Sequence, residues 1–131
     1  MPSLVDPLRS FFESRDDGLL AAYLFGSVAR GTAREGSDVD IAILLDRDPP
    51  RTLDGLALRL EGDLERFLGR RVQVVVLNRS PVDLIHRVLR DGQILLDRGR
   101  SARLRFEVRA RAEYLDLLPF LRRYRRSGDA A

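Results

Sequence analysis

The chain has 131 residues and a formal net charge of +3, with 44% apolar and 33% charged residues. This length and composition fit one globular domain with one core. The absence of cysteine excludes a disulfide framework and thiolate metal ligands, and the absence of lysine excludes a lysine nucleophile or a P-loop lysine. No apolar stretch approaches the roughly 18 residues of a membrane span, and the first residues do not resemble a signal peptide, so we expect a cytoplasmic protein without membrane contact.

The first half of the chain predicts one helix, two strands and a loop. Apolar residues recur at helical spacing over residues 3–16. Leu19 to Phe25 is a nearly continuous apolar run, typical of a strand covered on both faces, and Val39 to Leu45 is a second one. Residues 26–36 between them form a loop that starts with a short helix, and Asp46 to Pro50 form a turn.

The second half predicts a helix over about 52–68, a strand from Val72 to Leu77, a helix from Pro81 to about Arg90, a short edge strand from Gln93 to Leu96 and a final helix over 100–125. Pro119 is expected to kink or split this last helix. The order of elements indicates an α+β domain, a small mixed sheet with packed helices. The link between the first two strands is too short for a long crossover helix, so they are expected to pair antiparallel.

The end of the chain is basic. Residues 1–97 hold 13 arginines and 16 acidic residues, whereas residues 98–131 hold 10 arginines and four acidic residues. A solvated helix face is the simpler interpretation of the basic segment from about residue 100, and contact with an acidic partner is the alternative. Direct binding of nucleic acid is not expected, because the aromatic spacing does not resemble a stacking platform. An apolar cluster over residues 115–121 belongs either to the core or to the face of a homo-oligomer.

The loop after the first strand has the residues of a phosphate site. Gly26 and Gly31 allow a close approach of the backbone. Ser27 adds a hydroxyl where the chain enters a helical turn, and backbone N–H groups at such a turn favour an anion. Arg30 and Arg34 add fork-shaped donors that match phosphate oxygens.

Two carboxylates stand at the head of the second strand. Asp38 and Asp40 point to the same face, because a strand alternates its side chains. Two like charges this close repel each other, and Mg²⁺ is a suitable compensating ion because it is held by a few carboxylates together with substrate phosphates. A phosphate cradle beside a metal pair implies phosphoryl or nucleotidyl transfer.

The run G-S-V-A-R-G-T-A-R-E-G-S-D-V-D at residues 26–40 resembles the signature of the nucleotidyltransferase superfamily that includes DNA polymerase beta and kanamycin nucleotidyltransferase. The short chain, with G-R-R-V-Q-V-V-V-L-N at 69–78 and R-V-L-R-D-G-Q-I-L-L at 87–96, resembles the minimal nucleotidyltransferases (MNT). The resemblance implies a single nucleotidyltransferase domain over residues 1–131 and an antitoxin that transfers AMP from ATP to a tyrosine of a helical HEPN-domain toxin. The candidate nucleotide-binding residues are Gly26, Ser27, Arg30, Arg34 and Ser37, and the candidate catalytic and Mg²⁺-binding residues are Asp38 and Asp40.

One position departs from the family pattern. The family places a third carboxylate on the third strand, where this chain has Gln73. A neutral amide ligates weakly and is not a useful base near neutral pH. The alternative function is therefore a weak or inactive nucleotidyltransferase fold that only binds nucleotide or its toxin partner. Outside the motif, His86 falls on the polar side of its predicted helix and is interpreted as a surface residue, and Tyr114 is assigned to packing or partner contact.

Overall fold

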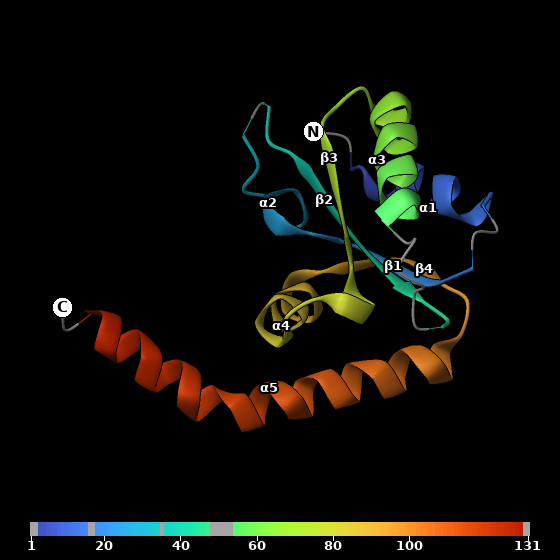
Figure 1. The fold of residues 1–131 in the computed structure, drawn as a ribbon. Helices are drawn as coiled ribbons and strands as arrows, with labels where there is room; N and C mark the ends of the chain where they lie inside the picture. The colour runs from blue at the N-terminus through green and yellow to red at the C-terminus, as the bar shows by residue number, and fades with distance from the viewer. Residues whose placement is uncertain (1–2, 16–17, 35, 48–53, 130–131) are drawn as a thin grey trace.

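The computed structural model describes residues 3–15, 18–34, 36–47 and 54–129 (Figure 1). Within these ranges the chain forms a four-stranded sheet with helices on both faces, which confirms the predicted α+β class. The helices are α1 (Val5–Glu13), α2 (Gly26–Arg30), α3 (Asp54–Leu68), α4 (Val82–Asp91) and α5 (Arg100–Asp129), with a 3₁₀ turn at Leu77–Arg79. The strands are β1 (Leu19–Phe25), β2 (Val39–Leu45), β3 (Val72–Val76) and β4 (Gln93–Asp97). Parts of two predictions, the turn at 48–50 and the helix start at 52–53, lie outside the described residues.

The strand order in the sheet is β3-β2-β1-β4. β1 pairs antiparallel with β2, as the short link between them predicted, and antiparallel with β4. β2 and β3 pair in parallel, with α3 as the crossover between them. The side chain of Asn78, just after β3, extends this pairing by exchanging two hydrogen bonds with the backbone of Leu45.

The two faces of the sheet bury different sets of apolar side chains because the strands alternate. On β2, Ile41 and Ile43 face a core that includes Leu8 and Phe12 of α1. Figure 1 shows α1 and α3 on this side of the sheet and α4 and α5 on the other. The second core joins the alternate β2 residues to residues of β1, α4 and α5, namely Ala21, Tyr23, Ala42, Leu44, Ile85, Val88 and Ala110.

The first half of α5 is fixed to the sheet by buried charges. Arg103 donates a hydrogen bond to Asp97 Oδ2 on β4 at 2.9 Å and pairs with Glu107 one turn further along α5. Arg103 and Glu107 are 8% and 6% exposed. Burial and the nearby Glu107 raise the pKa of Tyr23, which lies below them on β1, to about 12. The Tyr23 phenol therefore stays neutral next to this charged group.

Of the two effects predicted for Pro119 in the helix α5, a kink or a split, the structure rules out the split, since the helix runs continuously to Asp129, four residues beyond the predicted end at 125. Figure 1 shows its axis bending in the second half, which extends beyond the rest of the fold. None of the described helices combines the length and apolar character needed to cross a membrane.

Candidate active site

The site is built where β1 ends and β2 begins. The antiparallel register places Phe25, the last residue of β1, opposite Asp40. The chain leaves β1 directly into α2, which starts at Gly26 and Ser27. The first N–H groups of a helix have no partner inside it, so α2 presents donors at the same edge of the sheet as the aspartates.

Gly26 lies against the carboxylate of Asp40. Its φ of +76° is a backbone conformation that L-residues with side chains rarely adopt. A Cβ at this position would lie 2.2 Å from Asp40 Oδ2 and 3.1 Å from its Cγ, inside van der Waals contact. Only glycine fits here, because it allows both the turn and the close approach of backbone and carboxylate.

The negative charge of Asp40 is only partly compensated by the described residues. Burial raises the pKa of Asp40 first, the neighbouring Asp38 charge raises it further, and Arg30 partly opposes this. Asp38 and Asp40 lie in alternation with Ala42 and Leu44, so they belong to the face of the sheet that α4 and α5 cover. Two oxygen ligands at the head of one strand fit a hard cation such as Mg²⁺, which would relieve the repulsion between them.

Arg30 is held beside this pair by the end of α4. Its Nη1 lies 3.7 Å from Asp91 Oδ2. Asp91 also accepts two hydrogen bonds from Arg90, at 3.0 and 2.8 Å, which is the main reason that its pKa is lowered. Gln93 Nε2 donates to the backbone oxygen of Ala29 at 3.2 Å. The corner between α4 and β4 therefore fixes the C-terminal end of α2.

Sequence reasoning did not assign Asp91 and Gln93 to the site. They lie 51 and 53 residues after Asp40, the end of the motif, and their only signal is their position in the D-G-Q run within the stretch that resembles the family. Gly92 between them is forced by packing: a Cβ there would lie 2.3 Å from the backbone oxygen of Val88. This glycine brings the carboxylate and the amide close to α2.

Gln73 occupies the place expected for a third ligand. The parallel register puts it opposite Asp40, so the two side chains share a face. Gln73 is exposed. Among the described residues, no group of three or more His, Cys, Asp or Glu side chains could hold a metal ion. The potential ligand set therefore has two carboxylates and one amide.

The remaining candidates do not all converge on the carboxylates. Ser27 is half-buried in the first turn of α2, and its backbone oxygen accepts a hydrogen bond from Thr32 at 3.0 Å. Arg34 and Ser37 are joined by a hydrogen bond of 2.8 Å from the Arg34 N–H to Ser37 Oγ. Both line a pocket of about 810 Å³ that is also lined by Leu4, the residue before α1. Neither Asp38 nor Asp40 lines this pocket. The structure thus groups Gly26, Ser27 and Arg30 with the aspartates and sets Arg34 and Ser37 in an adjacent pocket.

His86 is not the free surface residue that its helical position suggested. Its ring stacks on Tyr114 of α5, with centroids 3.7 Å apart and planes 4° from parallel. Tyr114 therefore serves packing between α4 and α5, as assigned. The misinterpretation of His86 arose because a helical wheel for α4 does not show that α5 covers its polar side.

These features define a nucleotidyltransferase domain of the polymerase beta type. Residues 7–101 match the family model described as "Polymerase beta, Nucleotidyltransferase", so the chain belongs to that family. The match spans the whole sheet and ends at the start of α5. The comparison with curated proteins found no match.

Solved structures of antitoxins share the fold over almost the whole chain. A crystal structure of a toxin–antitoxin pair with AMP-PNP has a chain that is 25% identical, with a TM-score of 0.76, covering 96% of this chain and 98% of that one. A MntA–HpeT pair in which a tyrosine is replaced by alanine gives 25% identity, a TM-score of 0.75 and coverage of 96% and 97%. The tri-AMPylated Shewanella oneidensis HEPN toxin in complex with MNT antitoxin gives 21%, 0.71, and coverage of 95% and 97%. All three of these structures are toxin–antitoxin complexes, and one of them is described as a HEPN toxin with an MNT antitoxin, the pair that the resemblance named.

Proposed function

We propose that this chain is an MNT-type antitoxin that transfers AMP from ATP to a tyrosine hydroxyl of a HEPN-domain toxin. The observation that carries the proposal is the Asp40 carboxylate packed against Gly26, with Asp38 beside it, in a chain of the nucleotidyltransferase family. Two similar structures support it, since both are of toxin–antitoxin pairs and one contains the ATP analogue AMP-PNP.

In this proposal Asp38 and Asp40 hold Mg²⁺, which when bound neutralises charge on the triphosphate. The N–H groups at the start of α2 and the Arg30 guanidinium bind phosphate oxygens. Asp91 keeps Arg30 at the site, since the two side chains form an ion pair. The acceptor oxygen forms a bond to the α-phosphorus while the bond to pyrophosphate breaks, and the hydroxyl proton leaves to a base.

The experiment is label transfer to a purified HEPN-domain protein. ATP labelled at the α-phosphate is expected to label the HEPN protein, whereas ATP labelled at the γ-phosphate is not, because pyrophosphate leaves. Asp38→Asn with Asp40→Asn is expected to abolish transfer. Asp46→Asn is a matched control because Asp46 is exposed at the opposite end of β2. Label transfer that survives in the double variant would refute the assignment of the site.

A second candidate function follows from Gln73. A domain with two carboxylates and an amide opposite Asp40 binds nucleotide or its toxin partner without efficient transfer. In that case the wild-type chain forms the complex and is stabilised by ATP, but leaves the HEPN protein unlabelled. The same labelling experiment therefore separates the two functions.

A further inference from the structure

The pocket of about 810 Å³ beside the candidate active site lies on the other face of the sheet from the aspartates. Its apolar wall is formed by Leu4, Val5, Leu24 and Val28, which belong to the core on the α1 side or pack against it. Leu4, Val5 and Val28 stay half-buried where they border the pocket. The volume falls within the range of pockets that bind small molecules, about 300–1,000 Å³. We call this cavity the α1 pocket.

Three arginines form the other wall of the α1 pocket. Arg34 comes from the loop after α2, and Arg70 and Arg71 come directly before β3. None of the ion pairs within the described residues involves these three side chains, and no described Asp or Glu lines the pocket. Arg70 is held in place by a hydrogen bond of 2.9 Å from its Nη2 to the backbone oxygen of Ser37. The pocket therefore presents positive charge that matches a carboxylate or a phosphate.

The apolar and the basic residues come from different strands, so the α1 pocket has two ends. Leu24 lies on β1, whereas Arg71 directly precedes β3. In the sheet order β3-β2-β1-β4, the strand β2 separates them. Neighbouring strands lie about 4.8 Å apart, so two strand spacings amount to about 10 Å. A ligand that reaches both ends is therefore elongated, with an apolar body and an anionic head.

The apolar end selects the chemistry of the ligand body. Its side chains are aliphatic, and none of the described residues that line the pocket is aromatic. A nucleotide base would find no ring to stack on, although stacking contributes strongly when proteins bind bases. An alkyl chain fits aliphatic walls, and each buried methylene strengthens binding by about fourfold. The lining therefore favours an alkyl chain over a second nucleotide.

We infer that the α1 pocket is a second ligand site for a small amphipathic anion, an alkyl chain that ends in a carboxylate or a phosphate. The alkyl chain lies along Leu24 and Val28, and the head group pairs with Arg34 and Arg71. The short helix α2 separates the two sites, since Val28 lines the pocket while Gly26 packs against Asp40. The inference goes beyond the proposed function and does not depend on it.

The test is isothermal titration calorimetry of the full chain with decanoate and with decyl phosphate, both below their critical micelle concentrations. Binding of either anion supports the site, and the tighter of the two identifies the head group. Decanol has the same chain without the charge, and we expect it to bind more weakly by about tenfold or more, the contribution of a hydrogen bond to a charged group. Octanoate should bind about tenfold more weakly than decanoate, because it lacks two methylenes.

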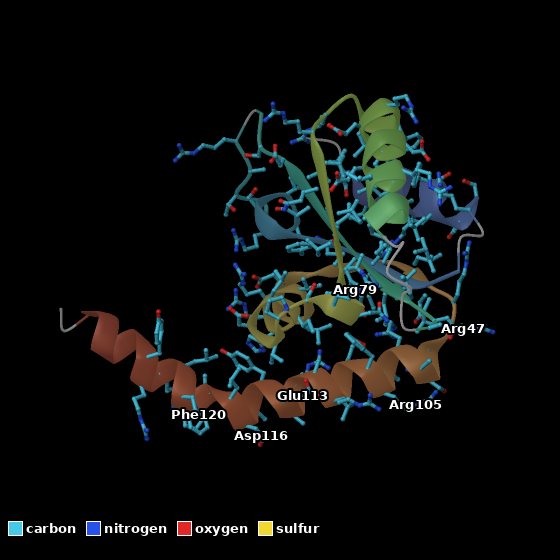
Figure 2. All side chains as sticks on the ribbon, in the orientation of Figure 1. Arg47, Arg79, Arg105, Glu113, Asp116 and Phe120 are labelled. Atoms are coloured by element: carbon cyan, nitrogen blue, oxygen red, sulfur yellow. The ribbon has the colours of Figure 1, made fainter. Side chains whose placement is uncertain are left out.

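Paired substitutions locate the anion in the pocket. Arg34→Gln with Arg71→Gln is expected to weaken binding of the tighter anion by about tenfold or more. Arg59→Gln with Arg105→Gln is the matched control, because it removes the same charge from exposed positions on α3 and α5 (Figure 2), and its affinity should stay within about twofold of the wild type. The methyl resonances of Val28 should shift on binding. Melting temperatures check that both variants fold.

Four outcomes would overturn the inference. The first is that neither anion binds the wild-type chain, and the second is that decanol binds as tightly as the anions. The third is wild-type affinity in Arg34→Gln with Arg71→Gln. The fourth is displacement of the anion by ATP with Mg²⁺, which would make the α1 pocket part of the nucleotide site. We expect instead that Asp38→Asn with Asp40→Asn, which removes the proposed metal ligands, binds the anion as the wild type does.

Discussion

At the scale of single residues, the site depends on one contact between a glycine and a carboxylate. Gly26→Ala would force a Cβ to 2.2 Å from Asp40 Oδ2 in a left-handed backbone. We expect it to lower the free energy of unfolding by about 1–2 kcal/mol for the backbone alone and to displace Asp40, so that AMP transfer is lost. The measurements are urea denaturation and label transfer.

Gly18→Ala is the control for this variant. Gly18 has the same φ of +76°, but a Cβ there meets nothing within 4 Å. It should show a similar backbone penalty with full transfer. Equal loss of transfer in both variants would mean that general destabilisation, and not the contact with Asp40, is responsible.

Gln73 is the second residue that decides the chemistry. Because it lies opposite Asp40 in the parallel register, Gln73→Asp would place a third carboxylate on the same face. General base assistance is worth roughly 10²–10⁴-fold, so we expect the variant to transfer AMP faster than a slow wild type, by about 100-fold at the low end of that range. Label transfer at matched ATP and Mg²⁺ measures this. Fast transfer by the wild type that Gln73→Asp abolishes would show that another residue supplies the base.

The raised pKa of Asp40 gives a pH dependence. A carboxyl group whose pKa is raised by folding stabilises the fold while it is protonated, and this contribution is lost as the pH rises through the raised pKa. Asp40→Asn should therefore stabilise the metal-free protein near pH 7, by less than about 1 kcal/mol because the group is partly exposed. This gain should shrink as the pH falls through the raised pKa. The measurement is urea denaturation of the wild type and Asp40→Asn in EDTA from pH 4 to 7. A difference in free energy of unfolding that stays constant over this range would show that Asp40 does not titrate in this way.

At the scale of elements, α5 is attached to the sheet through a buried ion pair. Arg103→Met would leave Glu107 buried with only the half-exposed Arg111, 3.9 Å away, as a cation. Loss of one partner of a buried pair typically costs about 3–5 kcal/mol, so we expect a large fall in the denaturation midpoint. Arg105→Met, two residues along on the exposed side of α5 (Figure 2), should change stability by no more than about 0.5 kcal/mol. Similar effects of the two variants would mean that the pair contributes little to docking α5.

Two other connections between elements set the geometry of the site. The corner between α4 and β4 holds the end of α2 through Asp91 and Gln93. The stack of His86 on Tyr114 joins α4 to α5. Helix α4 therefore contacts both α2, which carries Arg30, and α5.

At the scale of the whole molecule, ligand binding should appear as added stability. A ligand that binds only the folded state stabilises it by mass action, by about 2.7 kcal/mol at 100 times its dissociation constant. We expect ATP with Mg²⁺ to raise the melting temperature more than ATP alone. The metal-dependent part should disappear in Asp38→Asn with Asp40→Asn, as followed by differential scanning calorimetry. An unchanged shift in that variant would place the nucleotide elsewhere.

The sequence by itself determined the elements and the class of site. The four strands were predicted to within a residue at each end, because continuous apolar runs and β-branched residues are local signals that burial on two faces imposes. The motif from Gly26 to Asp40 was also readable, since the chemistry of phosphate and metal binding restricts the residue types. The departure at Gln73 was visible only through the resemblance to the family. Antiparallel pairing of β1 and β2 followed from the shortness of the link between them.

Only the tertiary structure decided which distant residues meet. The contact of Asp91 with Arg30, the stack of His86 on Tyr114 and the separation of Arg34 and Ser37 from the carboxylates depend on how α4 and α5 pack on one face and α1 and α3 on the other. Periodicity tells which side of a helix is apolar, but not which neighbour covers it or how far the helix extends beyond that neighbour. For the same reason the sequence could not assign the cluster at residues 115–121 to the core or to an interface. The structure shows that large apolar side chains of this cluster are exposed.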